Sequence, residues 1–182
     1  FKGGDIRDPA FHELLIRWFQ FGVFCPVFRL HGFRQDSEGD PRLGRDFLAG
    51  GAANEIWSFG PEVEARLAAC LQLRERLRPY IRAQMRRAHE TGLPPMRPLL
   101  VDFPGDPAAA EVDDQFMFGD ALLVAPILQA GARGRRVTLP AGETWREFHG
   151  GATHAGGTTV GAEAPLDRIP VFLRESAGPL PE

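Results

Sequence analysis

Cysteine, long apolar runs and an excess of basic charge are all scarce in this sequence, and each scarcity excludes a class of protein. The two cysteines, Cys25 and Cys70, lack CxxC spacing, so we expect buried free thiols in a reducing, cytoplasmic location. The longest apolar runs, such as 121–128, are too short to span a bilayer. A net charge of −3 provides no clustered basic surface. Neither a membrane nor a nucleic acid is therefore an expected partner.

Familiar catalytic motifs are absent as well. The sequence contains no Gly-x-Ser-x-Gly elbow, no glycine-rich phosphate loop with lysine and no His-Glu-x-x-His. The five histidines are scattered without the spacing of metal ligands. We therefore predict no metal and no cofactor, and these motifs assign no catalytic residue.

The first patterned segment combines a helix with a short strand. Asp8-Pro9 is an N-cap followed by proline in the first helical turn. Apolar and small residues then recur at helical spacing, namely Leu14, Leu15, Trp18, Phe19 and Gly22. Cys25-Pro26 ends this helix, and 27–30 is predicted to be a buried strand. A helix that leads directly into an apolar strand is typical of a βα repeat.

A second helix and an all-β region follow a predicted loop at 32–54. The helix begins at Ser58 or Gly60, is kinked by Pro79 and ends at Gly92. After Met96 the sequence changes to short β-prone segments separated by Gly, Pro and Asp turns, which is typical of an antiparallel sandwich. The predicted strands are 99–103, 115–118, 121–128, 136–139, 144–148, 158–160 and 169–173. The part before Met96 has too few elements for a complete parallel sheet, so it is predicted to be a piece of a larger α/β barrel.

His31 is the one histidine whose position points to function. It lies where the predicted strand gives way to Gly32, and the C-terminal ends of strands in a (β/α) barrel carry active-site residues. The pattern alone leaves two interpretations open: a residue of the active site, or a histidine that caps the strand and supports its neighbours.

The same stretch resembles a known family. Residues 17–32, RWFQFGVFCPVFRLHG, are similar to the segment that leads into barrel strand eight of glycoside hydrolase family 31. Phe1, where the chain begins without a methionine, resembles the last residue of that family's Asp-Ile-Gly-Gly-Phe segment. Further similar stretches follow in the family's order at 76–81, 97–100, 103–104, 114–119, 122–126 and 167–172. The resemblance implies the last helices and strand of a (β/α)8 barrel (1–96), followed by an antiparallel β-sandwich (97–182).

This resemblance also implies a chemistry. Family members are retaining α-glycosidases, in which one carboxylate attacks the anomeric carbon and a second acts as acid and then base. Both carboxylate motifs, Trp-x-Asp-Met-Asn-Glu-like and Ser-Trp-x-Gly-Asp-like, precede this region in the family, and neither occurs here. We therefore expect a C-terminal fragment that is inactive without the missing N-terminal part of the enzyme. His31 and Phe1 are its implied substrate-binding residues.

The substrate and the assembly are less constrained. The opening Phe-x-Gly-Gly-Asp-x-Arg-Asp-Pro resembles bacterial α-xylosidases and α-glucosidases, so terminal α-xylosides of oligosaccharides are favoured over α-glucosides. A homo-oligomer is also an expectation drawn from the family. Because neighbouring barrel elements are missing, we expect exposed apolar surface along 14–28 and a tendency of the first half to aggregate.

A non-catalytic alternative is a sandwich that binds carbohydrate or packs subunits. Exposed, evenly spaced aromatic residues on one sheet face would favour this alternative. The aromatic residues are instead spread over different predicted strands and are expected to fill the core; they are Phe103, Phe116, Phe118, Trp145, Phe148 and Phe172.

Overall fold

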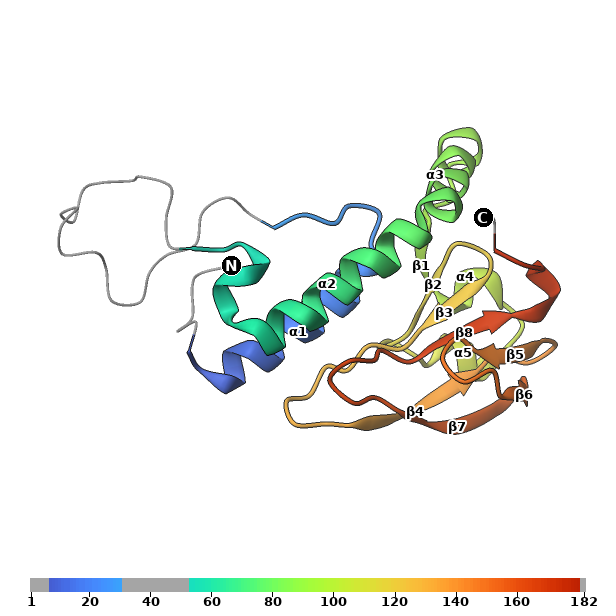
Figure 1. Cartoon of the computed structure of the whole chain (residues 1–182). Coiled ribbons are helices and arrows are strands. Elements are labelled where there is room, and N and C mark those ends of the chain that lie inside the picture. The colour runs from blue at the N-terminus through green and yellow to red at the C-terminus, as the bar shows by residue number, and fades with distance from the viewer. Residues whose placement is uncertain (1–6, 31–52, 181–182) are drawn as a thin grey trace.

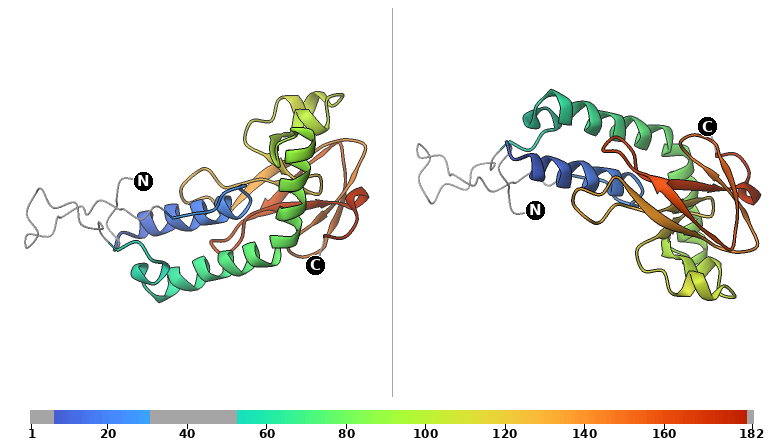
Figure 2. Two further views of the ribbon diagram at one scale, coloured as in Figure 1. Left: turned by 90° about the horizontal axis from the view of Figure 1, so that it is seen from above. Right: turned by 90° about the horizontal axis from the view of Figure 1, so that it is seen from below.

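The computed structural model describes residues 7–30 and 53–180, and within them a set of helices packs against a β-sandwich. The helical elements of the first half are α1 (Pro9–Val23), η1 (Ile56–Phe59), α2 (Pro61–Arg76) and α3 (Arg78–Thr91). Helices α1 and α2 lie side by side, while α3 turns away from the direction of α2 (Figures 1 and 2). No helix within these ranges is long and apolar enough to cross a membrane.

Helix α1 begins as the sequence predicts. The Asp8 side chain accepts a hydrogen bond from the backbone N–H of Ala10 at 2.9 Å, and Pro9 occupies the first turn. The helix ends at Val23, and the following Cys25-Pro26 leads into an extended segment. Residues 27–30 form no strand within the described part of the chain. The predicted strand is therefore wrong for these residues, which have no strand beside them to pair with.

The predicted kink at Pro79 is a complete break between two helices. Leu77 separates α2 from α3, and Pro79 lies in the first turn of α3, where its missing N–H costs nothing. Its ring would clash with the carbonyl of Glu75 in a continuous helix. Gly92 then ends α3 in the left-handed conformation, with φ 76°.

The second half forms two antiparallel sheets. Its strands are β1 (Met96–Pro98), β2 (Phe116–Phe118), β3 (Leu122–Val124), β4 (Gly134–Leu139), β5 (Thr144–Glu147), β6 (Thr153–Ala155), β7 (Thr158–Glu163) and β8 (Val171–Arg174). Six strands pair in the order β1-β2-β3-β8-β5-β6, and β4 pairs with β7 in the second sheet. The antiparallel sandwich predicted from the sequence is confirmed.

One local prediction fails in this half, and three short elements were not predicted. Residues 99–103 were expected to form a strand but contain the single-turn helix α4 (Leu99–Asp102). Arg97 pairs with Asp102 through two short contacts, 2.6 Å from Nε and 2.7 Å from Nη2, and this pair folds the chain back on itself. Strands β1 and β6, and the short helix α5 (Pro107–Ala110), were not anticipated.

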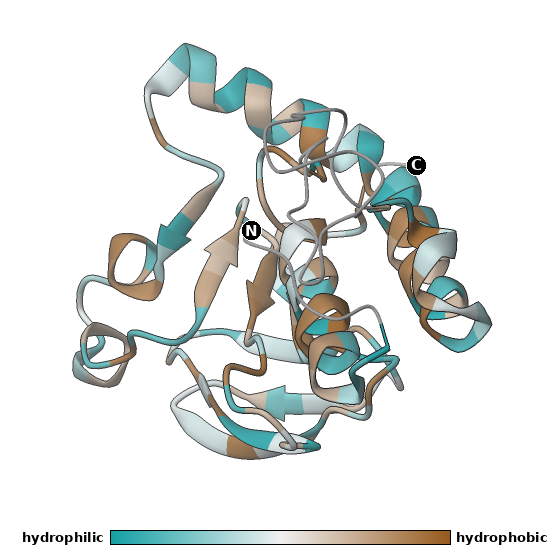
Figure 3. Ribbon diagram, turned by 90° about the vertical axis from the view of Figure 1, so that its left-hand side faces the viewer, coloured by the Kyte–Doolittle hydropathy of each residue, from teal (hydrophilic) through white to brown (hydrophobic). Residues whose placement is uncertain are grey.

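Side chains along the central strands point alternately to opposite faces of the larger sheet, so a hydrophobic core forms on each face. The residues facing the helices are Phe116, Phe118, Leu122, Val124, Val171 and Leu173, and those facing the second sheet are Met117, Leu123, Trp145 and Phe172. Figure 3 shows apolar residues, in brown, on α1 and on the central strands. Of the six aromatic residues expected in the core, all are buried except Phe148, which is half-buried.

Part of α1 stays uncovered. The side chains of Leu14 and Trp18 are 48% and 60% exposed, and Val27 beyond the helix is 77% exposed. This agrees with the expected apolar surface along 14–28. The opposite face of α1 packs on α2 and on the sandwich through Phe11, Leu15, Ile16, Phe19 and Val23.

Candidate functional site

The two predicted substrate-binding residues, His31 and Phe1, lie outside the described residues. The structure does describe the chain up to Leu30, the residue directly before His31. Helix α2 and the sandwich hold this segment and helix α1 before it.

Arg74 on α2 holds the chain as it leaves α1. Its guanidinium donates hydrogen bonds to the carbonyl oxygens of Val23 at 2.6 Å, Cys25 at 2.5 Å and Pro26 at 3.0 Å. The last carbonyls of a helix have no partners within it and attract positive charge. Burial lowers the pKa of Arg74, but an arginine still remains charged. One side chain thus fixes the direction of the segment that leads to residue 31.

Phe28 fixes the same segment from another side. Its ring contacts that of Phe19 edge-on, with centroids 5.3 Å apart, and Arg74 lies 6.0 Å from its centroid. Gly22 lets the ring approach the helix, because a Cβ atom there would lie only 2.7 Å from two ring carbons. A glycine in the last turn of this apolar helix therefore has a packing reason.

Arg17 joins α1 to the sandwich. It is 8% exposed and has no ion pair within the described residues. Its side chain donates to Gln20 and to the backbone carbonyls of two sandwich loops, which are Ala132 (3.1 Å), Ala164 (2.7 Å), Pro165 (3.2 Å) and Arg168 (3.0 Å). The carbonyls around it replace the water that a buried guanidinium loses.

Two neighbours of Arg17 on the same helical face add hydrogen bonds between α1 and the sandwich. We call such a set of polar contacts between a helix and the sandwich a joint. Gln20 is 3% exposed and donates to the carbonyl of Leu166 at 2.8 Å. Glu13 pairs with Arg133 at 2.6 Å and accepts from the N–H of Gly131 at 3.1 Å. The hydrogen bond from Arg133 is the main reason that the pKa of Glu13 is lowered. A polar stripe on an otherwise apolar helix therefore bonds to the β3–β4 and β7–β8 loops.

Helix α3 forms a second joint at the β2–β3 turn. The buried hydroxyl of Tyr80 donates to the carbonyl of Phe118 at 2.7 Å and accepts from the N–H of Ala121 at 3.1 Å. Asp120 accepts from Gln84 and Arg87, each at 2.7 Å. Its carboxylate is therefore occupied in a structural network that links α3 to the β2–β3 turn.

The described residues offer little catalytic machinery of their own. Within 7–30 and 53–180, no group of three or more His, Cys, Asp or Glu side chains is arranged to hold a metal ion. Both cysteines are free thiols, and burial raises the pKa of Cys70 to about 11. Neither thiol has the lowered pKa of a nucleophile.

Comparison with known families matches both halves of this architecture. The glycosyl hydrolase family 31 TIM-barrel domain matches residues 2–84, and the glycosyl hydrolase family 31 C-terminal domain matches residues 92–177. The fold is thus the end of a catalytic barrel followed by its C-terminal domain. The chain belongs to glycosyl hydrolase family 31.

Individual relatives include both xylosidases and glucosidases. The alpha-xylosidase of Saccharolobus solfataricus is 31% identical over 97% of this chain and 22% of its own length. Human neutral alpha-glucosidase AB is 35% identical over 94% of this chain and 17% of its own length. The crystal structure of a GH31 alpha-xylosidase from a soil metagenome, complexed with xylose, superposes with a TM-score of 0.89 at 56% identity, covering 98% of this chain and 27% of that one. The chain thus spans about a fifth of the length of the curated relatives it matches.

Proposed function

We propose that this chain is the C-terminal portion of a retaining α-glycosidase that removes terminal α-xylosides from oligosaccharides, with α-glucosides as the second choice of substrate. One observation carries the proposal: 98% of the chain superposes on an α-xylosidase complexed with xylose, at 56% identity. The α-glucosidases among the relatives support the second choice.

The chemistry assigns this chain a supporting part in the reaction. Retention requires two carboxylates about 5 Å apart, and neither family motif that supplies them occurs in the sequence. The nucleophile and the acid/base would come from the preceding part of the barrel, and the chain alone would hydrolyse nothing. Its partners would be that remaining barrel and an oligosaccharide.

His31 and Phe1 are the residues we propose to touch the substrate. A neutral imidazole donates from one nitrogen and accepts at the other, so it can orient a sugar hydroxyl. The Arg74 contacts support this role, because they fix the chain up to Pro26, five residues before His31. Phe1 would pack against the apolar face of the sugar ring.

The same proposal includes a domain boundary and a location. We place the end of the barrel portion at residue 96 and the sandwich at 97–182, with the sandwich acting as a buttress for α1 through Arg17. Free cysteines agree with a reducing, cytoplasmic location, and a homo-oligomer is retained from the family resemblance.

The aromatic residues give little support to a stand-alone sugar-binding or subunit-packing module. Such a module would need aromatic side chains on an open sheet face. Five of the six candidates are buried, and the sixth, Phe148, is half-buried.

A chimera tests the proposed function. This chain replaces the corresponding C-terminal segment of the soil metagenome α-xylosidase, and release of nitrophenol from aryl α-xyloside and aryl α-glucoside is measured. We expect activity with a preference for the xyloside, and no turnover by the isolated chain. A folded chimera without either activity would contradict the proposal.

Variants of the chimera then test His31. His31→Ala should lower kcat by about 100-fold, as expected when a donor to the transition state is lost, with a smaller change in KM. His89→Ala, at an exposed position on α3, serves as the matched control. An increase in KM with unchanged kcat would reduce His31 to simple recognition.

A further inference from the structure

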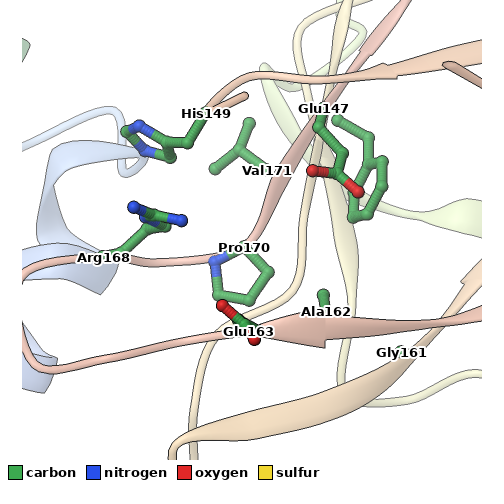
Figure 4. Close-up of a pocket in the computed structure, with 9 residues that line it drawn as sticks. Glu147, His149, Gly161, Ala162, Glu163, Arg168, Pro170 and Val171 are labelled. Atoms are coloured by element: carbon green, nitrogen blue, oxygen red, sulfur yellow. The ribbon is translucent and has the colours of Figure 1, made fainter. Parts of the chain in front are cut away.

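An open hollow of about 240 Å³ lies on the sandwich, beside the β7–β8 loop to which Arg17 and Gln20 bind. Figure 4 shows the side chains that surround it. Pro170 and Val171 provide apolar atoms, while Glu147, His149, Glu163 and Arg168 provide the polar groups. Residues of both sheets line this hollow, because Glu147 ends β5 and Glu163 ends β7.

The backbone around the hollow is held by hydrogen bonds on all sides. Phe148 N–H donates to Val171 at 2.9 Å, Ala164 N–H to Arg133 at 2.8 Å and Arg168 N–H to Pro165 at 3.0 Å. Arg17 and Gln20 of α1 bind the carbonyls of 164–166 and of Arg168 from behind. The hollow is therefore formed before any ligand arrives, which reduces the ordering cost of binding.

Its polar groups are free to bind. Within the described residues, the side chains of Arg168, Glu163 and His149 have no hydrogen bond or ion pair. Glu147 uses one oxygen, Oε1, to contact His154 Nε2 at 2.9 Å, which leaves Oε2 available. Burial, followed by the charge of Arg168, lowers the pKa of His149, so its imidazole is neutral near pH 7 and can both donate and accept.

The arrangement of these groups selects the chemistry of the ligand. In Figure 4, His149 and Arg168 stand at one end, with Glu147 across the hollow and Glu163 below. Two carboxylates repel an anion, and Arg168 repels a cation. A neutral polyhydroxyl compound fits both ends, since its hydroxyls donate to carboxylates and accept from a guanidinium. Its C–H groups can contact Pro170 and Val171.

We propose that this hollow is a non-catalytic binding site for one pyranose residue of a neutral oligosaccharide. A volume of about 240 Å³ lies just below the range of pockets that enclose drug-sized ligands, about 300–1,000 Å³, and so suits a single sugar ring. The inference takes only the class of ligand from the proposed function. Phe172 also lines the hollow but is only 1% exposed, so we expect no ring stacking and, in an open hollow, a millimolar affinity.

The test is an NMR titration of the 182-residue chain, labelled with ¹⁵N, with methyl α-xyloside and then methyl α-glucoside. We expect saturable amide shifts confined to 147–149 and 161–172. Arg168→Ala and Glu163→Ala should each weaken binding at least several-fold. Arg82→Ala and Glu90→Ala, at exposed positions on α3, should leave it unchanged. Shifts that do not saturate, or that survive both hollow variants, would overturn the proposal.

If the isolated chain gives a poor NMR spectrum, crystallography of the chimera provides a second measurement. Crystals of the chimera are soaked with methyl α-xyloside; density in the hollow supports the proposal, and density in the barrel alone overturns it. Binding here and hydrolysis by the chimera are separate readouts. An active chimera with an empty hollow would refute the sugar site alone, whereas an inactive chimera whose hollow binds sugar would refute the proposed function alone.

Discussion

Arg17→Met is the most direct perturbation of the joint between the helices and the sandwich. Methionine keeps the apolar stem of the side chain but removes donors to Gln20 and to four backbone carbonyls. Hydrogen bonds to charged groups contribute about 1.5–3 kcal/mol each. Most of that sum is offset, because the variant no longer buries a charge and water can reach several of the carbonyls. We expect a net loss of about 3 kcal/mol, in the range for disrupting a buried polar network.

The assay is thermal unfolding of the 182-residue chain, followed by circular dichroism and by tryptophan fluorescence. For a chain of this size, a loss of about 3 kcal/mol lowers Tm by roughly 6–12 °C. Arg17→Lys retains the charge but not the planar fork, so it should recover less than half of the loss. Arg82→Met, at an exposed position on α3, is the matched control. If Arg17→Met unfolds within about 2 °C of this control, the joint does not stabilise the chain as argued.

Three further predictions concern other contacts. In the chimera, Arg74→Ala should lower kcat at least 10-fold with a smaller change in KM, because the segment before residue 31 loses its anchor; a fall in stability without any change in kcat would contradict this. Gly119→Ala should destabilise the chain by about 2–4 kcal/mol, since φ is 67° and the new methyl group would collide with Tyr80; unchanged urea unfolding would refute the packing. Glu13→Gln should reduce the loss of stability on acidification. Because the pKa of Glu13 is lowered in the fold, its carboxylate stabilises the fold above the ordinary pKa of 4.5, and this contribution disappears as pH falls through the folded-state pKa. Parallel stability–pH curves for the two proteins would disprove that linkage.

The broad architecture could be predicted from sequence because its signals are local. Asp8-Pro9 caps α1 as expected, and Gly92 ends α3. The short β-prone segments after Met96 form a sandwich, because alternating side chains with turns between them have few other ways to bury both faces. The strand expected at 27–30 failed for a non-local reason: a strand exists only beside a partner, and the described residues provide none there.

The joints could not be predicted in the same way. Arg17 and Arg74 each interrupt an apolar helical face, and this is the only sign in the sequence that Arg17 is buried and Arg74 half-buried. Their acceptors are backbone carbonyls up to 151 residues away in the chain. Every residue has such a carbonyl, so the sequence does not indicate which ones accept a hydrogen bond. The helix at 99–102 depends on the pairing of Arg97 with Asp102, which periodicity does not register.

Arg17 and Arg74 bind their partners in the same way, and this bears on how the sandwich supports the barrel. Arg17 is buried and Arg74 is half-buried, neither forms an ion pair within the described residues, and both bond to backbone carbonyls of another element. A carboxylate partner could be satisfied in several rotamers, whereas a set of fixed carbonyls accepts the planar guanidinium in one orientation. Helix α1 is thus held along its middle by Arg17 and at its C-terminal end by Arg74. The segment that leaves α1 inherits that orientation, so the sandwich can influence the sugar site that we propose in the barrel without contacting that sugar.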